Sequence, residues 1–209
     1  MSLHTYLLFI IASIVLCAVP GPDMVYLLGR TIGQGKKAGL VSAVGINVGA
    51  YIHLICAVLG VSAIIATSAV AFTLVKWCGA AYLFYLGLQA LFAKTQTPSS
   101  TAPVKRSATL QSIFWQGVLI DLLNPKVALF YMALLPQFVQ LQSGNVFIQL
   151  FVLGITLNVI ALIINILLVL VAHWLADKFG KNQLAVSLLN KIMGGIFIGL
   201  GVRLANEHR

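Results

Sequence analysis

Charged side chains are scarce in this sequence, and acidic ones are the scarcest. Only 8% of the 209 residues are charged, with 13 Lys and Arg against 4 Asp and Glu. A soluble domain averages about 25% charged residues, so a surface facing water cannot be built along most of this chain. Hydrophobic residues make up 60% of it, and its mean hydropathy is +1.02. These values predict an integral membrane protein whose main solvent is lipid.

Paired cysteines are also missing. Cys17, Cys56 and Cys78 lie singly within apolar runs, and the sequence contains no CxxC. It therefore indicates neither a disulfide framework nor a redox pair, and the thiols are expected to act as small hydrophobes. Metal sites need clustered Cys, His or carboxylates, and here these residues are dispersed, without a recognisable Ser/His/Asp cluster. We expect no metal, no cofactor and no enzymatic activity.

Long apolar stretches are abundant, and six of them suit a membrane-spanning helix, which needs about 20 residues. The first stretch lacks a basic leader and is too long for an ordinary signal peptide, so it is expected to be retained. The sequence thus predicts an all-α membrane protein with six transmembrane helices. Their approximate bounds are Thr5–Leu28, Ala38–Ser62, Ala69–Phe92, Gln111–Leu135, Val146–Ala172 and Val186–Leu204.

The basic residues predict an orientation. A net charge of +9 would suggest a nucleic-acid partner for a soluble protein, but here most basic residues lie between the spans. No nucleic-acid partner is therefore expected. The positive-inside rule places the more basic side in the cytoplasm and both termini outside, in a bacterial cytoplasmic membrane. The residues on that side are Arg30, Lys36, Lys37, Lys94, Lys105, Arg106, Lys178, Lys181 and Lys191.

A polar segment, residues 94–110, is rich in Ser, Thr and Pro and separates residues 1–93 from residues 111–209. Each half holds three predicted spans, and similar short motifs recur in the same order. Because an odd number of spans reverses the orientation of the second half, we predict two inverted three-helix repeats, a common transporter plan. The matching motifs are Pro22-Asp23 with Pro125-Lys126, Gly45-Ile46-Asn47 with Gly154-Ile155-Thr156, and Lys76-x-x-Gly79 with Lys191-x-x-Gly194.

The motif PGPD, at residues 20–23, lies well inside the first predicted span. Proline removes a backbone donor and clashes with the preceding turn, so we predict that the first and fourth helices are broken at proline. Broken backbone at membrane depth must be buried in protein or line a wet cavity. The half-helix that follows would present N–H groups and a positive dipole end to a carboxylate, although the break could also only improve packing. The predicted helix-break residues are Pro20, Gly21, Pro22 and Pro125.

Three charged residues lie within the first and fourth predicted spans. A carboxylate as deep as Asp23 costs about 2.5–3.5 kcal/mol on insertion scales, so it is expected to be paired, protonated or facing water. Its counterpart in the second half is Lys126, which has the opposite charge. The two residues could bind a substrate or form a structural ion pair. Asp121 is a further candidate, and Asp23 and Asp121 are the predicted proton-coupling groups.

Polar amides complete the candidate site. Asn47 and Asn158 lie within the second and fifth spans and could reach a substrate, as could Asn124 and Pro22 beside the breaks. His53 is expected to form a hydrogen bond between helices, as such intramembrane groups often do.

Several short motifs occur in a fixed order along nearly the whole chain. They are PGPD at residues 20–23, Gly35-Lys36-Lys37-Ala38-Gly39, Gly45-x-x-x-Gly49, WCGAAYL at residues 77–83, Asn124-Pro125-Lys126, LLPQF at residues 134–138 and LNKIMG at residues 189–194. This combination resembles the LysE/RhtB family of amino-acid exporters. The resemblance implies secondary export of amino acids driven by the proton gradient. Asp121 departs from the family pattern, because relatives are expected to carry an uncharged polar residue at this position. The net charge of the preferred substrate is therefore left open.

The sequence is therefore interpreted as a secondary transporter that exports small amino acids from the cytoplasm by proton antiport. A zwitterion would fit between the two broken helices, with its ammonium near Asp23 and its carboxylate near Lys126. Expected partners are the amino acid, protons, membrane lipid and a second copy of the chain in a dimer. The alternatives are efflux of a metal or other small cation on the same scaffold and, with less support, a membrane redox protein.

Overall fold

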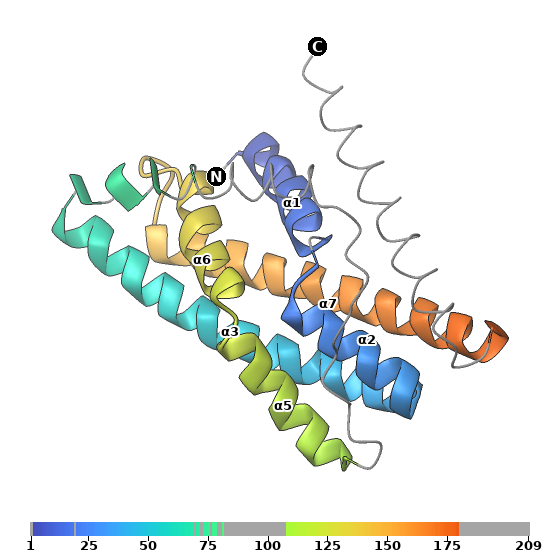
Figure 1. Cartoon of the computed structure of the whole chain (residues 1–209). Coiled ribbons are helices and arrows are strands. Elements are labelled where there is room, and N and C mark those ends of the chain that lie inside the picture. Colours follow the sequence, from blue (N-terminus) through green and yellow to red (C-terminus); the bar gives the residue numbers. More distant parts are fainter. Residues whose placement is uncertain are drawn as a thin grey trace.

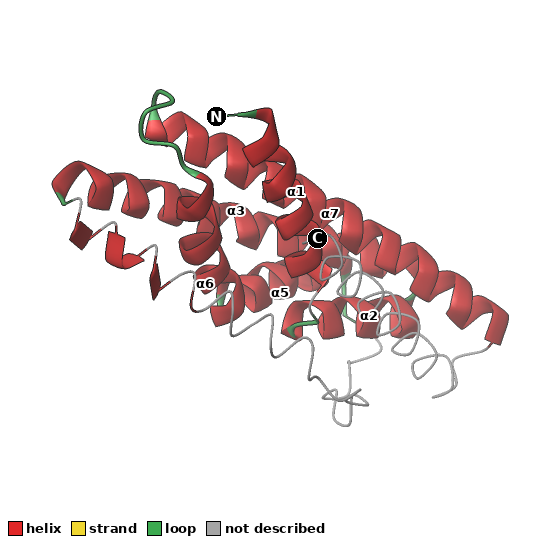
Figure 2. Ribbon diagram, turned by 90° about the horizontal axis from the view of Figure 1, so that it is seen from above, coloured by secondary structure: helices red, strands yellow, loops and turns green. Residues whose placement is uncertain are grey.

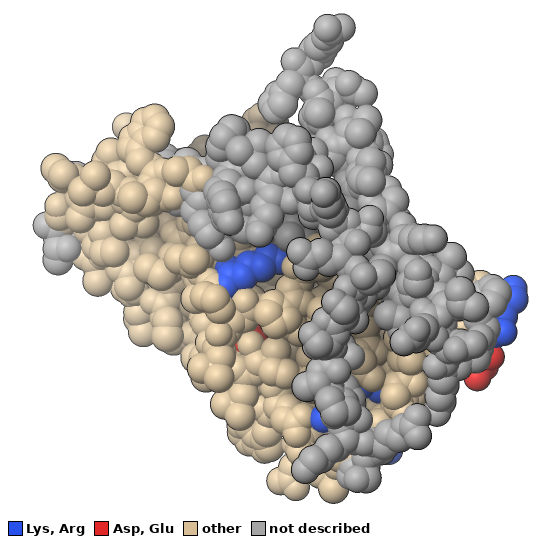
Figure 3. All heavy atoms as spheres, viewed as in Figure 1, with Lys and Arg blue, Asp and Glu red and all other residues tan. Residues whose placement is uncertain are grey.

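The protein is described by a computed structural model that covers residues 2–18, 20–68 and 108–179, with isolated positions between 70 and 81. All regular structure in these residues is helical, as Figure 2 shows from above. The described surface carries few charged atoms on the face drawn in Figure 3. The helices are α1 (Leu3–Ala18), α2 (Pro22–Gln34), α3 (Lys36–Thr67), α5 (Leu110–Leu122), α6 (Pro125–Leu134), the short 3-10 helix η1 (Leu135–Phe138) and α7 (Val146–Phe179).

Two of these helices, α3 and α7, are long and apolar enough to cross a membrane by themselves. Two further spans are formed if each bent pair of helices is counted as one. The pair α1 and α2 bends by 62°, and the pair α5 and α6 with η1 bends by 55°. The described part of the chain therefore contains two to four spans. The predicted sixth span, the third span apart from isolated positions, and most of the linker at 94–110 lie outside the described residues.

Helices α3 and α5 cross at short distance because glycines remove side chains from their interface (Figure 1). A Cβ atom at Gly45 would lie 2.3 Å from the carbonyl oxygen of Phe114, and one at Gly117 would lie 3.0 Å from that of Ser42. The first distance is shorter than real Cβ contacts allow, and the second is at the tight limit. Larger residues at these positions would therefore push the helices apart. This close crossing fixes the C-terminal end of α5, where Asp121 lies, against α3.

The main core joins α1, α3, α6 and α7 on one side of the two bends. Leu54 of α3 contacts α7 where Gly154 leaves room, since a Cβ at Gly154 would lie 1.9 Å from its Cδ1. Phe9 of α1 packs edge-to-face on Phe138 of η1, with ring centroids 5.2 Å apart. Apolar packing therefore connects the half-helices α1 and α6 through η1 and α7.

The turn between α2 and α3 consists of one residue, Gly35, with φ of +88°. This left-handed conformation strongly favours glycine. The first span therefore continues as α2 to Gln34, six residues beyond the predicted end at Leu28. Arg30, which was predicted to lie in the connection between spans, is instead a buried helical residue with 4% exposure. The prediction missed this because a basic residue was assumed to end the span.

Candidate functional site

The first helix break separates α1 from α2. Helix α1 ends at Ala18, and α2 begins at Pro22, which is its first residue after the extended cap Gly21. Proline suits this position because the first N–H groups of a helix have no intrahelical partner in any case. Asp23 lies in the first turn of α2, where the positive end of the helix dipole favours a carboxylate.

The second break separates α5 from α6 and repeats this arrangement. Pro125 opens α6, and Asn124 caps it by accepting a hydrogen bond from the backbone N–H of Lys126 at 3.1 Å. Asn124 is buried, with 3% exposure. Here the first charged residue after proline is a lysine, so the two half-helices begin with opposite charges.

The two breaks lie next to each other, although about one hundred residues separate them in the sequence. The side-chain amide of Asn124 donates a hydrogen bond to Oδ1 of Asp23 at 3.2 Å, across a sequence separation of 101. A Cβ atom at Gly21 would lie 2.4 Å from that same oxygen and 3.6 Å from the amide nitrogen of Asn124. The half-helices α2 and α6 therefore begin at one shared point inside the molecule.

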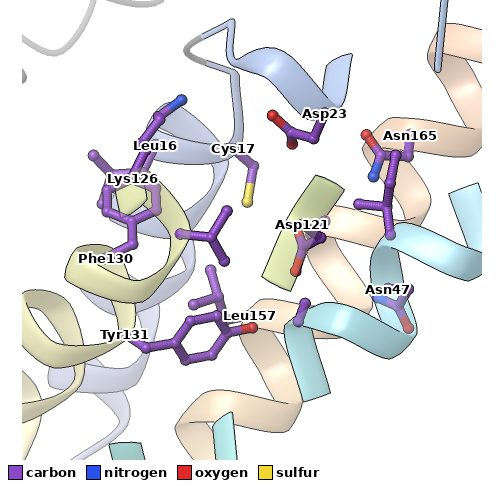
Figure 4. Close-up of a pocket in the computed structure, with 14 residues that line it drawn as sticks. Leu16, Cys17, Asp23, Asn47, Asp121, Lys126, Phe130, Tyr131, Leu157 and Asn165 are labelled. Carbon is purple, nitrogen blue, oxygen red and sulfur yellow. The ribbon is translucent and has the colours of Figure 1, made fainter. Parts of the chain in front are cut away.

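A cavity of about 60 Å³ lies at this point and is drawn in Figure 4. One water needs roughly 10–15 Å³ by this kind of measure, so the space holds several waters or part of a small molecule. The half-helices on both sides of each break contribute to the wall, together with α3 and α7. The lining residues are Leu16, Cys17, Asp23, Ile46, Asn47, Ala50, Asp121, Lys126, Val127, Phe130, Tyr131, Leu157, Ala161 and Asn165.

Three charged side chains line the cavity. Asp23 lies close enough to both Asp121 and Lys126 for its charge to interact with theirs. In Figure 4 the two acids lie on one side of Cys17 and Lys126 lies on the other. The cavity therefore has an acidic end and a basic end, with apolar side chains between them. Lys126 also lies over the ring of Phe130, with Nζ 5.8 Å from the ring centroid.

Asp121 is the most deeply buried of the three, with 2% exposure. No described group forms a hydrogen bond with its Oδ2 atom. Its backbone carbonyl is 3.0 Å from Nε2 of His53 on α3, which confirms the prediction that His53 bonds between helices. Asp121 and Lys126, five positions apart, line one cavity because the chain leaves the helix between them.

Buried amides support the wall opposite the breaks. The side chain of Asn47 donates to the backbone carbonyl of Asn158 at 3.0 Å, and the hydroxyl of Tyr131 donates to the side-chain oxygen of Asn158. Asn158 is fully buried. These bonds connect α3, α6 and α7, so the positions of Asn47 and Tyr131 at the cavity depend on Asn158.

The structure brings together four of the residues singled out from the sequence, namely Asp23, Asn47, Asp121 and Lys126. Pro22, Pro125 and Asn124 shape the two helix starts, and Asn158 supports the wall without lining it. Pro20 and Gly21 form the extended connection between α1 and α2.

The sequence reasoning missed Cys17, Phe130 and Tyr131 as lining residues. Cys17 occupies the last turn of α1, just before the first break, and that adjacency was a usable signal. Phe130 lies four positions after Lys126, one helical turn away on the same face. Tyr131 had no comparable signal, because its contact with Asn158 depends on how α6 packs on α7.

A second polar cluster joins α2 to α5 away from the cavity. The hydroxyl of Tyr26 donates to the carbonyl of Ile113 at 2.8 Å, and Nη2 of Arg30 donates to Oε1 of Gln116 at 2.7 Å. The side chain of Gln34 donates to the carbonyl of Ala108 at 3.1 Å. Hydrogen bonds thus join the half-helices α2 and α5. Because Arg30 is charged and buried, loss of its bond to Gln116 would be costly.

The described residues contain no group of three or more His, Cys, Asp or Glu side chains that could hold a metal ion. The chemistry that the site offers is therefore that of two carboxyls, one ammonium and several amides in a small, mostly apolar space. Such a site can bind a small polar molecule and exchange protons with it.

Comparison with known proteins agrees with the family resemblance seen in the sequence. The model of LysE type translocators matches residues 14–208. The membrane protein YrhP of Bacillus subtilis is 33% identical over 96% of this chain and 98% of its own length, and the leucine efflux protein of Salmonella typhimurium is 30% identical over 96% and 94%. No solved structure gives a significant match. The chain therefore belongs to the LysE type translocator family, and it is a multi-pass membrane transporter rather than a catalytic enzyme.

Proposed function

We propose that this protein exports small amino acids from the cytoplasm by exchange with protons. The observation that carries the proposal is the meeting of two half-helix starts at one cavity, with Asp23 on one and Lys126 on the other. A similar relative, 30% identical over 96% of this chain, is named a leucine efflux protein, which supports an amino acid as the substrate.

A zwitterion matches the charge arrangement of the cavity. Its carboxylate would lie near Lys126 and the positive end of the α6 dipole, while its ammonium would lie near Asp23. Discontinuous helices that face a substrate with their N-termini occur in other transporters. Apolar residues between the two ends, such as Leu157 and Val127, would then contact the substrate's side chain.

Proton exchange would follow from the imbalance of charge in the same cavity. When all three groups are ionised, Asp23 and Asp121 carry two negative charges against the single positive charge of Lys126. One proton bound to either acid balances them. Protonation of Asp23 would also weaken its attraction for the ammonium, so that proton binding and substrate release are linked.

For the membrane arrangement we propose two inverted three-span repeats with both termini outside the cytoplasmic membrane. The backbone N–H of Ser2 donates to Oε1 of Gln140 at 3.2 Å, so the N-terminus and the segment before α7 share one end of the molecule. Gln34 and Ala108 mark the opposite end. Apart from Lys126, the described basic residues lie toward that opposite end, which the positive-inside rule assigns to the cytoplasm. They are Arg30, Lys36, Lys37 and Lys178.

Cysteine labelling tests this orientation. In a background with the native cysteines replaced, single cysteines at Ser2 and His208 should react with a membrane-impermeant maleimide in intact cells. Lys37→Cys should react only after permeabilisation. The opposite pattern would show that the orientation is reversed, without affecting the transport proposal.

Transport itself is tested with the purified full-length protein in proteoliposomes that carry a proton gradient. A panel of radiolabelled amino acids should reveal one or more that move against their gradient, and dissipation of the proton gradient should stop this movement. Absence of transport for every amino acid, with a folded protein in the vesicles, would refute the proposal.

A further inference from the structure

Asp121 is a buried acid whose position the proposed antiport mechanism does not fully explain. We infer that Asp121 is a specificity-determining residue that recognises the ammonium group of the substrate together with Asp23. The cavity would therefore accept molecules with a primary amine at one end and a carboxylate at the other, and reject the same carbon skeleton without the amine. This inference rests on the proposed function. It assigns the binding of the substrate's amine to the acidic end of the same cavity.

The first support is an incomplete set of hydrogen bonds. Asp121 has 2% exposure and lines the cavity, yet its Oδ2 atom has no hydrogen-bond partner among the described residues. Buried polar atoms are nearly always paired, so an orphan of this kind calls for a partner from outside the protein. Asp23 differs, because its Oδ1 atom already accepts a hydrogen bond from Asn124.

The second support is that the protein makes room for this carboxyl. A Cβ atom at Gly49 of α3 would lie 2.8 Å from Cβ of Asp121 and 2.9 Å from its Oδ2. The same Cβ would lie 2.9 Å from the carbonyl oxygen of Val118, so a larger residue at position 49 would displace the acid or the α5 backbone that carries it. His53, one helical turn further along α3, holds the backbone carbonyl of Asp121 at 3.0 Å. The carboxyl is thus held in a defined place by α3, as a recognition group needs to be.

The third support is the electrostatic setting. Asp121 lies in the last turn of α5, where the negative end of the helix dipole favours a cation. Asp23 is near enough for the two charges to interact, and both acids lie apart from Lys126 in Figure 4. An ammonium has three donors and no acceptor, so two carboxyls suit it better than one.

The test compares recognition of the amine in wild type and Asp121→Asn, using full-length protein in proteoliposomes. The probes are the best amino-acid substrate and its des-amino analogue, the carboxylic acid of the same skeleton, as a competitor. In Asp121→Asn we expect KM for the amino acid to rise about tenfold to a hundredfold, because a charge-assisted hydrogen bond is lost. The inhibition constant of the des-amino acid should change less than about threefold.

Two controls separate recognition from other roles. Asp177→Asn removes an exposed acid near the end of α7 and should leave both constants unchanged. Gly49→Ala keeps every charge but must shift the Asp121 side chain or the α5 backbone at Val118, and should lower the preference for the amino acid over the des-amino acid by a smaller factor. If Asp121→Asn does not fold, Gly49→Ala provides the same test.

The inference is overturned if, in the variants, the ratio of the KM for the amino acid to the inhibition constant of the des-amino acid stays at the wild-type value. It is also overturned if Asp121→Asn loses only the dependence on protons or on sodium, because the acid then serves an ion and not the amine. Lack of amino-acid transport by the wild type would instead refute the proposed function, and this inference with it.

Discussion

The two helix breaks place proline at the same position but differ in how they are capped. At the first break the cap is Gly21, which has no side chain to bond with the start of α2. At the second, Asn124 caps α6 and also donates to Asp23 in the first turn of α2. The second break therefore caps its own half-helix with a side chain. The first break lacks such a cap, and its carboxylate is held by a residue of the second break.

The charges that follow the prolines differ as well. Asp23 and Lys126 occupy corresponding places, and a molecule with separated charges can contact both. An identical pair of breaks would place like charges together, which would repel each other at membrane depth. The comparison shows that similar local backbone can present opposite charges at corresponding positions.

The largest effects are expected when the charge difference between the breaks is removed. Asp23→Asn should reduce export by at least about tenfold and abolish its dependence on the proton gradient, because an amide at this position neither attracts the ammonium as a charge nor carries a proton in exchange for it. Lys126→Met should raise KM, because the substrate carboxylate loses its counter-charge. Transport per folded protein, measured in proteoliposomes, checks both expectations.

The double variant Asp23→Asn with Lys126→Met distinguishes transport from structure. If the two charges form only a structural pair, each single variant should lose about 3–5 kcal/mol of stability, and the double variant should recover it together with transport. Proton-driven export by the double variant at the wild-type rate would rule out the proposed mechanism and leave the family assignment intact.

An intermediate effect is expected from Asn124→Ala. The variant loses the cap of α6 and the hydrogen bond to Asp23, so we expect about 1–3 kcal/mol less stability and a several-fold rise in KM. Asn145→Ala is the matched control, because Asn145 also accepts a bond at the start of a helix, from Ile148, but far from the cavity. Thermal unfolding in detergent and substrate affinity are the readouts. Equal effects of the two variants on KM would contradict a role for Asn124 in placing Asp23.

A smaller effect is expected from Gly21→Ala. The added Cβ would lie 2.4 Å from Oδ1 of Asp23, so the carboxylate must turn away and give up its bond to Asn124. Because the clash involves the end of a side chain, stability should change by less than about 1 kcal/mol while KM rises a few-fold. Gly33→Ala, in open space on the same helix, is the control and should leave transport unchanged.

The smallest effect on function is expected from Cys17, which lies beside the first break. Cys17→Ser should transport close to the wild-type rate, since the thiol fills space and holds no charged group. In a Cys56→Ser, Cys78→Ser background, a small maleimide that reacts with Cys17 should block transport, and excess substrate should slow the reaction. Labelling that substrate does not affect would show that the substrate binds elsewhere.

Much of the site follows from local chemistry. Pro22 and Pro125 predict the breaks because proline has no N–H and clashes with the turn before it, wherever it stands in the fold. A substrate was predicted to bind between the two broken helices. The contact of the breaks through Asn124 was not predicted, because that bond joins residues 101 positions apart. The hydrogen bond between Arg30 and Gln116 was not predicted for the same reason, because these residues are 86 positions apart.

The sequence by itself determined the solvent of this protein, the sites of its helix breaks and the charges that follow them, since composition and proline act locally. Only the tertiary structure decided that Asp121 shares a cavity with Asp23 and Lys126, because this depends on the 55° bend between α5 and α6 and on the room left by Gly49. It also decided that Cys17 and Tyr131 line the same space. Such placements depend on contacts between distant helices, and no local pattern along the chain encodes them.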